Sequence, residues 1–427
     1  MSRALAISAF GSNSGKTLLT TALLYHFRSR VRAFKVGPDF IDPQFHKRVS
    51  GLDSINLDSF IMSEEQIRWI FERYSDQEFA LVEGVMGFYD GEDRGCSTHL
   101  VTNYLQIPTI LIIDCSGSYI TISAQLKGLR EYKSKNQIRG VVLNRISSQN
   151  HFKLIKDILL NDHPDILVFG WVKKSLPSLR SRHLGLDLED LSKIEQISQE
   201  VLENINTKAL EDFAREIKNI TPKEYPFPSF QRQKGKKLAV VNDKNFSFLY
   251  YDNLMFFKEA FDEVLIIDST KDEQIPADID SIFICGGYVE SDLAYSRIKD
   301  SHKFRKSLIS HHQKGTKIYG ECAGLLYLGQ GVDKKSMSGI LDAEFELQER
   351  FVRLGYYYNE QGLKGHCFHY TKPTKQSLNS GFDRLSKRLN NKGEVGSWKK
   401  GKSFGTFFHT MFRVYPHLIL DESSPVV

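Results

Sequence analysis

Short apolar segments alternate with amphipathic stretches along the first half of the chain. The apolar segments are continuous in character, as strands buried on both faces of a sheet are. They read ALAIS, RAFKVG, FALVEG, TILIID, GVVLN and ILVFG. The stretches between them space their apolar residues as helices do, for example at Leu19, Ala22, Leu23 and Phe27. Strands that alternate with helices predict an α/β fold with a doubly wound parallel sheet.

A break in this pattern divides the chain. Residues 221–237, TPKEYPFPSFQRQKGKK, carry three prolines and then a basic cluster without apolar periodicity, which is typical of an interdomain linker. After it the alternation resumes with KLAVVND, EVLIID, SIFICGG and KIYGEC. We therefore predict two α/β domains, residues 1–220 and 238–427, which suits a length of 427 residues.

Composition and charge restrict the classes of partner. A net charge of +5 without a concentrated basic stripe argues against nucleic-acid binding, and we interpret the basic run 384–402 as a solvated loop. No apolar run approaches the roughly 20 residues that span a bilayer, so we expect no membrane anchor and no signal peptide. Five cysteines without a C-x-x-C pair favour a reducing cytoplasm over a disulfide framework or a zinc site.

The segment GSNSGKT follows the first predicted strand and precedes a helix, which is the context of a phosphate-binding loop. Backbone N–H groups and the helix dipole would hold phosphate oxygens, Lys16 would reach the β- and γ-phosphates, and Thr17 would bind Mg²⁺. Phe10 stands where the strict motif has its first glycine, so an ordinary glycine turn is the alternative. The predicted ATP-binding residues are Gly11, Ser12, Asn13, Ser14, Gly15, Lys16 and Thr17.

Acidic residues follow the later strands of the same half. Asp39 and Asp42 lie in KVGPDFIDP, Glu83 and Asp90 lie in EGVMGFYDG, and Asp58 lies in NLD. Carboxylates at the carboxyl ends of parallel strands face the crevice in which such sheets bind ligands. They would repel a triphosphate unless Mg²⁺ lay between them, so a metal role is natural for some of them. Each of them alone would more commonly cap a loop.

A second candidate site lies in KIYGECAGLLYLG, residues 317–329. Cys322 stands between a short apolar strand and the start of a helix, with Gly320 and Gly324 on either side. A free cysteine commonly packs as a small hydrophobe. A cysteine at a tight turn from strand to helix can instead serve as a nucleophile beside backbone N–H donors, provided that a base is near.

Several motifs of the first half resemble, in order and spacing, the amidoligase domain of the cobyrinic acid a,c-diamide synthase family. They are KVGPDFIDPQFH, NLDSF, EGVMGFYDG, GVVLNRISS and RHLGL; dethiobiotin synthetase is a more distant relative with a similar phosphate loop. The resemblance implies phosphorylation of a substrate carboxylate by ATP, followed by displacement of phosphate by ammonia. It also implies that Thr17, Asp42 and Glu83 bind the metal, and that the substrate or phosphorylated intermediate contacts Asp39, Asp58 and Asp90. Ser181 departs from the glutamate that is usual in this family.

The second half resembles a class I glutamine amidotransferase in the blocks VNDKNFSFLYYDNL, FICGGYVE, YGECAGLLYLG, GHCFHY and GTFFHTMF. The resemblance implies that Cys322 is the nucleophile and His409 its base, with the backbone N–H groups of Gly287 and Ala323 as the oxyanion hole. Ala323 and Cys367 replace a glycine and a glutamate that are usual in the family, and Met411 replaces a second histidine. Because we identify no side chain that orients His409, we expect a cysteine–histidine dyad. We interpret the other cysteines as structural: Cys96, Cys115, Cys285 and Cys367.

These observations lead to the hypothesis of a cytoplasmic two-domain amidoligase that uses ATP, Mg²⁺ and glutamine. The expected substrate is a corrinoid acid, cobyrinate, amidated on its a and c acetate side chains, and the family implies a homodimer. One alternative is the same reaction on another tetrapyrrole, such as hydrogenobyrinate or nickel-sirohydrochlorin. An alternative of another class is a non-catalytic P-loop regulatory ATPase, although such a protein has no use for Cys322 on a thiol elbow.

Overall fold

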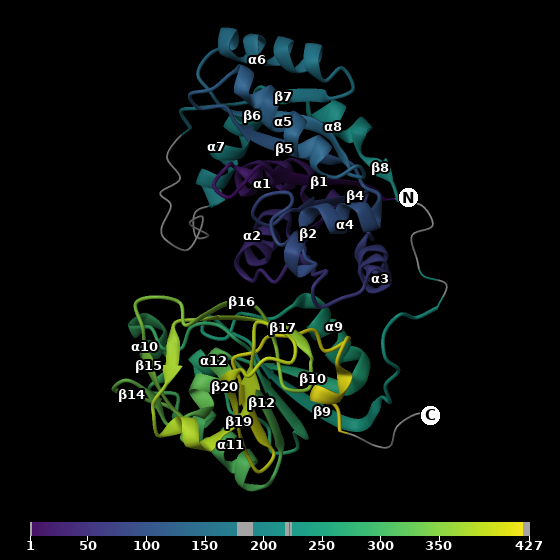
Figure 1. Ribbon diagram of the computed structural model, residues 1–427. Coiled ribbons are helices and arrows are strands. Elements are labelled where there is room, and N and C mark those ends of the chain that lie inside the picture. The colour runs from purple at the N-terminus through teal and green to yellow at the C-terminus, as the bar shows by residue number, and fades with distance from the viewer. Residues whose placement is uncertain (1, 177–190, 218–221, 223, 422–427) are drawn as a thin grey trace. The chain divides into compact units, whose positions relative to one another are not determined.

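The computed structural model divides the chain into two compact units, Met1–Pro226 and Phe227–Val427, here called unit 1 and unit 2. It describes residues 2–176, 191–217, 222 and 224–421 (Figure 1). Ser181 lies outside the described residues. Strand β9, Gln233–Val241, begins within the segment that we expected to be a linker. That segment therefore contributes residues to the second sheet.

Unit 1 is built on a parallel sheet with the strand order β3-β2-β4-β1-β5-β6-β7, to which β8 adds an antiparallel pairing with β1. This confirms the predicted doubly wound sheet. The predicted apolar segments become six of its strands, whereas β3 has only three residues and did not stand out in the sequence. The strands are β1 Arg3–Ala9, β2 Val31–Val36, β3 Ile55–Leu57, β4 Phe79–Glu83, β5 Thr109–Asp114, β6 Ile138–Ile146, β7 Leu167–Lys173 and β8 Arg215–Glu216.

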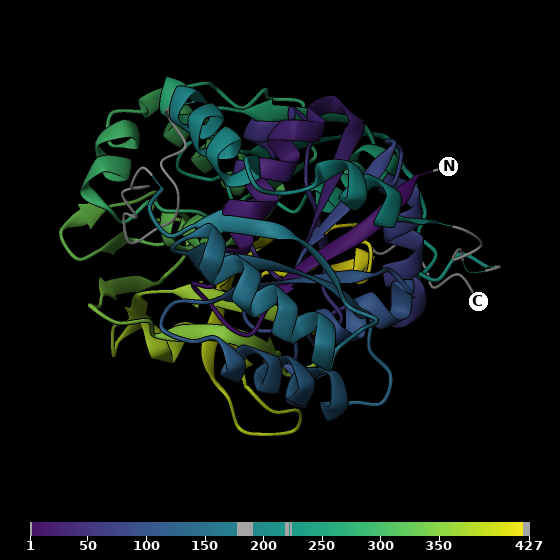
Figure 2. The same cartoon turned by 90° about the horizontal axis from the view of Figure 1, so that it is seen from above.

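Helices cover both faces of this sheet (Figures 1 and 2). Neighbouring residues of β5 show why its sequence is continuously apolar: Ile110 and Ile112 pack on one side with α1 and α7, and Leu111 packs on the other side with α5 and α6. The helices of unit 1 are α1 Lys16–Phe27, α2 Ile41–Ser50, α3 Glu64–Tyr74, α4 Thr98–Leu105, α5 Ile120–Tyr132, α6 Gln149–Asp162, α7 Leu191–Leu202 and α8 Thr207–Phe213.

Unit 2 contains a mixed sheet with the strand order β10-β9-β11-β12-β21-β20-β19. The first five strands in this order run parallel, β20 pairs antiparallel with β21, and β19 pairs antiparallel with β20. After β9, its strands are β10 Phe261–Ile267, β11 Ser281–Ile284, β12 Lys317–Glu321, β19 Gly381–Leu385, β20 Glu394–Lys400 and β21 Ser403–Thr406. The helices of unit 2 are α9 Tyr251–Ala260, α10 Asp292–Ile298, α11 His302–Gln313 and α12 Ala323–Leu328.

Two smaller sheets complete unit 2. One has the order β14-β13-β15-β18, and the other is a hairpin of β16 and β17. Their strands are β13 Gly331–Val332, β14 Lys335–Ser336, β15 Glu344–Leu347, β16 Arg353–Tyr358, β17 Lys364–His369 and β18 Thr371–Pro373. In the described part of the chain, no helix combines the length and the hydropathy needed to cross a membrane.

The interpretation of residues 384–402 as a solvated loop is wrong. The run enters the sheet as the end of β19 and the whole of β20. Trp398 of β20 is 1% exposed, packs edge-on against Phe345 and Phe407, and donates a hydrogen bond from Nε1 to the Ser377 carbonyl at 2.9 Å. The basic residues that suggested a loop are concentrated at the exposed end of β20 and in the turn before it.

Replacing Trp398 by alanine should lower the free energy of unfolding of unit 2 by about 3–5 kcal/mol, because the indole fills the core and its N–H is bonded. Urea denaturation followed by circular dichroism measures this change. The exposed Lys402→Ala variant is the control and should unfold like the wild type. Equal stability of the two variants would contradict the burial of Trp398.

Candidate active sites

The phosphate-binding loop joins β1 to α1 in a conformation that requires its glycine. Gly15 has φ 103°, and a Cβ there would lie 2.4 Å from Nδ2 of Asn144. That same Nδ2 donates to the Ser14 carbonyl at 2.8 Å, so a side chain of β6 is hydrogen-bonded to the loop. Lys16 reaches back across the loop and donates to the Gly11 carbonyl at 3.0 Å. Burial and the charge of Lys35 lower the pKa of Lys16.

Glu83 lies at the end of β4, fully buried, and is bonded to three other elements. Its Oε1 accepts from Thr17 Oγ1 at 2.8 Å and lies 3.3 Å from Lys35 Nζ. Its Oε2 lies 2.7 Å from Nε2 of His46. Burial alone would raise the pKa of Glu83, but Lys35, His46 and Thr17 outweigh burial and lower it to about 2. The carboxylate is therefore ionised at neutral pH.

Lys35 connects the acidic residues of this site. Its Nζ donates to Asp42 Oδ2 at 2.5 Å and lies 3.8 Å from Asp39 Oδ2. Burial opposes the charge on Lys35, but Glu83, Asp42 and Asp39 outweigh it and raise the pKa of the ammonium. Burial and the charge of Glu83 raise the pKa of Asp42 to about 6. The three predicted metal-binding residues are thus linked: Asp42 and Glu83 both contact Lys35, and Thr17 is bonded to Glu83.

The other predicted acids all cap turns. Oδ1 of Asp39 accepts from the N–H of Ile41 at 2.8 Å, and Oδ1 of Asp58 accepts from the N–H of Phe60 at 2.9 Å. Oδ2 of Asp90 accepts from the N–H of Gly87 at 2.7 Å. Asp90 also lies near enough to Lys16 for its charge to raise the pKa of that lysine. Asp39 and Asp90 are thus connected electrostatically to lysines of this site, while Asp58 accepts hydrogen bonds within its own turn.

Sequence reasoning missed Lys35 and His46. Lys35 stands between Phe34 and Val36 in a buried strand, and a charge at such a position usually has a partner, so the sequence did mark this residue. His46 lies on α2, and its second ring nitrogen, Nδ1, lies 3.1 Å from Ser54 Oγ. Nothing in the local sequence marks it as a partner of Glu83, because the two residues meet only through the packing of α2 on the sheet.

The donor set of this site fits Mg²⁺. In the described ranges, no three His, Cys, Asp or Glu side chains gather in a way that could hold a metal ion. Mg²⁺, however, commonly takes one or two carboxylates together with substrate phosphates and water. The Thr17 hydroxyl and the carboxylates of Glu83 and Asp42 are oxygen donors of this kind.

Cys322 occupies a strained turn between β12 and α12. Its φ is 47° and its ψ is −103°, which are unusual for a residue with a side chain. Its N–H donates to the Thr406 carbonyl at 2.7 Å. The two flanking glycines are required, because a Cβ at Gly320 would lie 2.8 Å from the Gly324 backbone, and one at Gly324 would lie 2.5 Å from the Ile284 carbonyl. The predicted elbow is therefore present.

Backbone groups of three residues lie at the Cys322 sulfur, whose thiol donates to the Phe368 carbonyl at 3.7 Å. Burial and the charge of Glu290 raise the pKa of the Cys322 thiol, whereas backbone hydrogen bonds from Gly287 and Ala323 lower it. Gly287 has φ 151°, and a Cβ there would lie 2.1 Å from the Asn245 carbonyl, so only glycine fits. The residues predicted to form an oxyanion hole thus lie beside the sulfur.

His409 is fully buried three residues after β21 ends. Gly286 packs on its ring so closely that a Cβ there would lie 2.3 Å from Cε1. Burial lowers the pKa of His409 to about 3, which leaves the imidazole neutral. Nδ1 lies 3.0 Å from Oε2 of Glu321. The sequence offered no acidic neighbour for His409, because Met411 stands where an orienting side chain is usual, whereas the structure brings Glu321 beside the ring.

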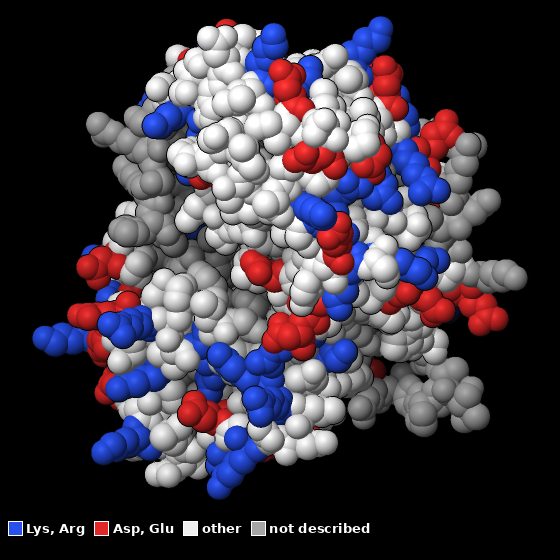
Figure 3. All heavy atoms as spheres, turned by 45° about the horizontal axis from the view of Figure 1, so that its top comes forward, with Lys and Arg blue, Asp and Glu red and all other residues white. Residues whose placement is uncertain are grey.

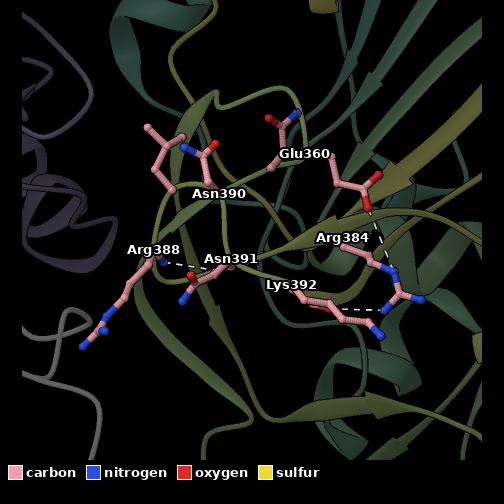
Figure 4. Close-up of a pocket in the computed structure, with 10 residues that line it drawn as sticks. Glu360, Arg384, Arg388, Asn390, Asn391 and Lys392 are labelled. Atoms are coloured by element: carbon pink, nitrogen blue, oxygen red, sulfur yellow. Dashed lines mark hydrogen bonds and ion pairs between the residues drawn. The ribbon is translucent and has the colours of Figure 1, made fainter.

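A cavity of about 290 Å³ lies elsewhere in unit 2, where the turn between β19 and β20 folds against Asn359 and Glu360 (Figure 4). Arg384 on its wall bonds the Gly393 carbonyl at 3.2 Å and lies 4.0 Å from Glu360. None of the predicted site residues lines this cavity. On the face drawn in Figure 3, basic and acidic side chains are interspersed.

Comparison with known proteins links both units to one enzyme class. Residues 5–184 match the model of the CobQ/CobB/MinD/ParA nucleotide binding domain, and residues 237–416 match the CobB/CobQ-like glutamine amidotransferase domain. The cobyrinate a,c-diamide synthase of Saccharolobus solfataricus is 33% identical over 86% of this chain and 88% of its own. Those of Clostridium tetani and Listeria innocua are 31% and 29% identical, each covering at least 96% of both chains.

Glu83 should make the stability of unit 1 depend on pH. Because its pKa is lowered from 4.5 to about 2, its contribution is fully present above pH 4.5 and is lost as the pH falls toward 2. The shift corresponds to about 3 kcal/mol. Urea denaturation at several pH values should show this loss in the wild type and a smaller loss in Glu83→Gln.

The exposed Glu65→Gln variant is the matched control for that measurement and should behave like the wild type. An unchanged pH dependence in Glu83→Gln would contradict the assignment of an ionised, buried carboxylate.

Proposed function

The chain belongs to the cobyrinate a,c-diamide synthase family, and we propose that it amidates the a and c acetate carboxylates of cobyrinate. It is an ATP-dependent amidating ligase with a glutamine amidotransferase domain. One observation carries the finer proposal: a single chain combines a phosphate loop bonded to an acidic cluster with a cysteine elbow whose preceding residue, Glu321, is bonded to the buried His409.

We propose that unit 1 forms an acyl phosphate. The phosphate loop would bind ATP, and Mg²⁺ held by Thr17, Asp42 and Glu83 would stabilise the charge that develops on the transferred phosphoryl group. The Lys16 ammonium lies within the loop, where it can contact phosphate oxygens. Lys35 offsets part of the negative charge of Asp39, Asp42 and Glu83. A substrate carboxylate can then approach without facing three uncompensated acids, and ammonia would displace phosphate from the activated carboxylate.

We propose that unit 2 supplies the ammonia. Both Cys322 and His409 are neutral at rest, because burial raises the pKa of the thiol and lowers that of the imidazole. The sulfur would attack the glutamine amide while His409 takes the thiol proton and later gives it to the leaving ammonia. Donors at Gly287 and Ala323 already contact the sulfur, so they can stabilise the adjacent oxyanion.

Mass analysis of the product identifies the substrate. Incubation with ATP, glutamine and cobyrinate should yield a product with two new amides. Hydrogenobyrinate and nickel-sirohydrochlorin are the alternative substrates, and preference for either would overturn the cobyrinate assignment. Absence of glutamine hydrolysis would instead favour a non-catalytic P-loop ATPase. All five cysteines are free, which suits the proposed cytoplasmic location, and sedimentation would test the proposed homodimer.

Lys16→Ala should lower ATP-dependent amidation by orders of magnitude, because it removes the cation that reaches the β- and γ-phosphates. The loop follows the carboxyl end of β1, outside the core of the sheet, so the thermal unfolding midpoint should change little. Lys47→Ala, at a lysine on α2 with a 58% exposed side chain, is the control and should retain activity. Amidation by Lys16→Ala at nearly the wild-type rate would show that the phosphate-loop assignment is wrong.

Cys322→Ser should abolish glutamine-dependent amidation, since a hydroxyl is a far weaker nucleophile here than a thiol. High ammonium chloride should restore formation of the same product, because the activated carboxylate accepts free ammonia. His409→Ala should behave alike, and the double variant should be little worse than either single variant. Product formation with each nitrogen source measures these effects.

Cys115→Ser, at a buried cysteine of unit 1, is the control for this series and should retain both reactions. If Cys322→Ser lost the glutamine-driven and ammonia-driven reactions equally, Cys322 would have a structural role. If it lost neither, the cysteine would be a packing residue.

A further inference from the structure

We infer that Glu321 positions His409 for proton transfer during glutamine hydrolysis. The acid of this site is then the residue directly before the nucleophile, Cys322, in the chain. The inference rests on the proposed glutaminase reaction of unit 2. The position after His409 at which an orienting side chain is usual holds Met411. Glu321 takes the role of orienting the His409 ring instead.

The contact follows from strand pairing. Glu321 is the last residue of β12, and it lies opposite Thr406, the last residue of the parallel neighbour β21. His409 follows three residues later and returns its ring toward the end of β12, so that Nδ1 lies 3.0 Å from Oε2 of Glu321. The N–H of Cys322, bonded to the Thr406 carbonyl at 2.7 Å, fixes the same junction. Acid, nucleophile and base are thus held by one pair of strands.

Close packing restricts other ring positions. Gly286 lies against Cε1 of His409, leaving no room for even a methyl group. The His409 backbone is also fixed, because its N–H and carbonyl pair with those of His366 on β17, both at 2.8 Å. Met411 is buried and apolar, so it cannot take the role of an acid. Glu290, the other buried acid near this site, acts on the thiol through its charge.

The hydrogen bond determines which ring nitrogen can act as a base. When Glu321 is ionised, it accepts the proton on Nδ1, and the lone pair of Nε2 is available to the thiol. As the sulfur–carbon bond forms and the amide carbonyl becomes an oxyanion, the thiol proton moves to Nε2. The imidazolium is stabilised by the carboxylate and then protonates the leaving ammonia as the carbon–nitrogen bond breaks. Water hydrolyses the thioester and regenerates the thiol.

Protonation of Glu321 would reverse this arrangement. The carboxyl would donate to Nδ1, the ring proton would occupy Nε2, and Nε2 could no longer take the thiol proton. Burial raises the pKa of Glu321, and the groups that feel its charge are Tyr319, Cys285 and Cys367, all neutral at neutral pH. His409 is its bonded partner. Glutaminase activity should therefore decline as the pH falls through the raised pKa of this acid.

Glu321→Gln tests the inference, because it keeps the size of the side chain and removes the charge. We expect kcat for glutamine hydrolysis to fall by about 10²–10⁴-fold with KM changed only a few-fold. The acidic limb of the wild-type pH profile should shift or disappear. Glu346→Gln, on a strand of the same unit with a 48% exposed side chain, is the matched control and should keep the wild-type profile.

Two further measurements make the outcome decisive. Alkylation of Cys322 by iodoacetamide needs no substrate, and its dependence on pH should move in Glu321→Gln but not in the control. If the glutamine variant is insoluble, Glu321→Asp should lower kcat at least tenfold. The inference is overturned if both variants keep the wild-type kcat. It is also overturned if kcat falls only because the variants are less stable while the pH profile stays unchanged. Glutamine hydrolysis by Cys322→Ser at the wild-type rate would instead overturn the proposed function.

Discussion

Unit 1 depends on the burial of one ionised carboxylate, Glu83. A buried charge is stable only when partners replace the water that it has lost, and the loss of one partner of a buried pair typically costs about 3–5 kcal/mol. Glu83 obtains these partners from α1, β2 and α2 through Thr17, Lys35 and His46. The helix that follows the phosphate loop is therefore held to the second strand by the same group that is suited to bind Mg²⁺.

Both units place their chemistry at the carboxyl ends of parallel strands. In unit 1 the phosphate loop follows β1 and Glu83 ends β4, two strands that are direct neighbours. In unit 2 the elbow follows β12, Gly287 follows β11 and His409 follows β21, and β12 lies between the other two strands. The carboxyl ends of neighbouring parallel strands lie side by side, however far apart the strands are in the sequence. This explains how segments remote in sequence form each site.

The sequence predicted the parallel strands, the phosphate loop and the cysteine elbow, because each has a local signature. It did not predict β20, since its basic residues obscured the packing of Trp398, or β3, since three residues carry too little pattern. Lys35 could have been predicted to take part in a charged cluster, because a charged residue within a buried strand usually has a partner. Glu321 offered no such signal: it contacts His409 only because β12 pairs with β21, and such pairing depends on the whole sheet.

Buried Glu83 and Lys35 of unit 1 are charged, whereas buried Cys322 and His409 of unit 2 are neutral. The neighbours of each pair explain this difference. In unit 1 buried charges of opposite sign lie within hydrogen-bond distance, so Glu83 and Lys35 stay ionised. In unit 2 burial keeps both the Cys322 thiol and the His409 imidazole neutral. We infer that an imidazolium and an oxyanion would arise there only as sulfur attacks the amide, beside the backbone donors and the Glu321 carboxylate. The ligase unit is thus arranged to hold charged reactants, and the glutaminase unit to stabilise a transient ion pair.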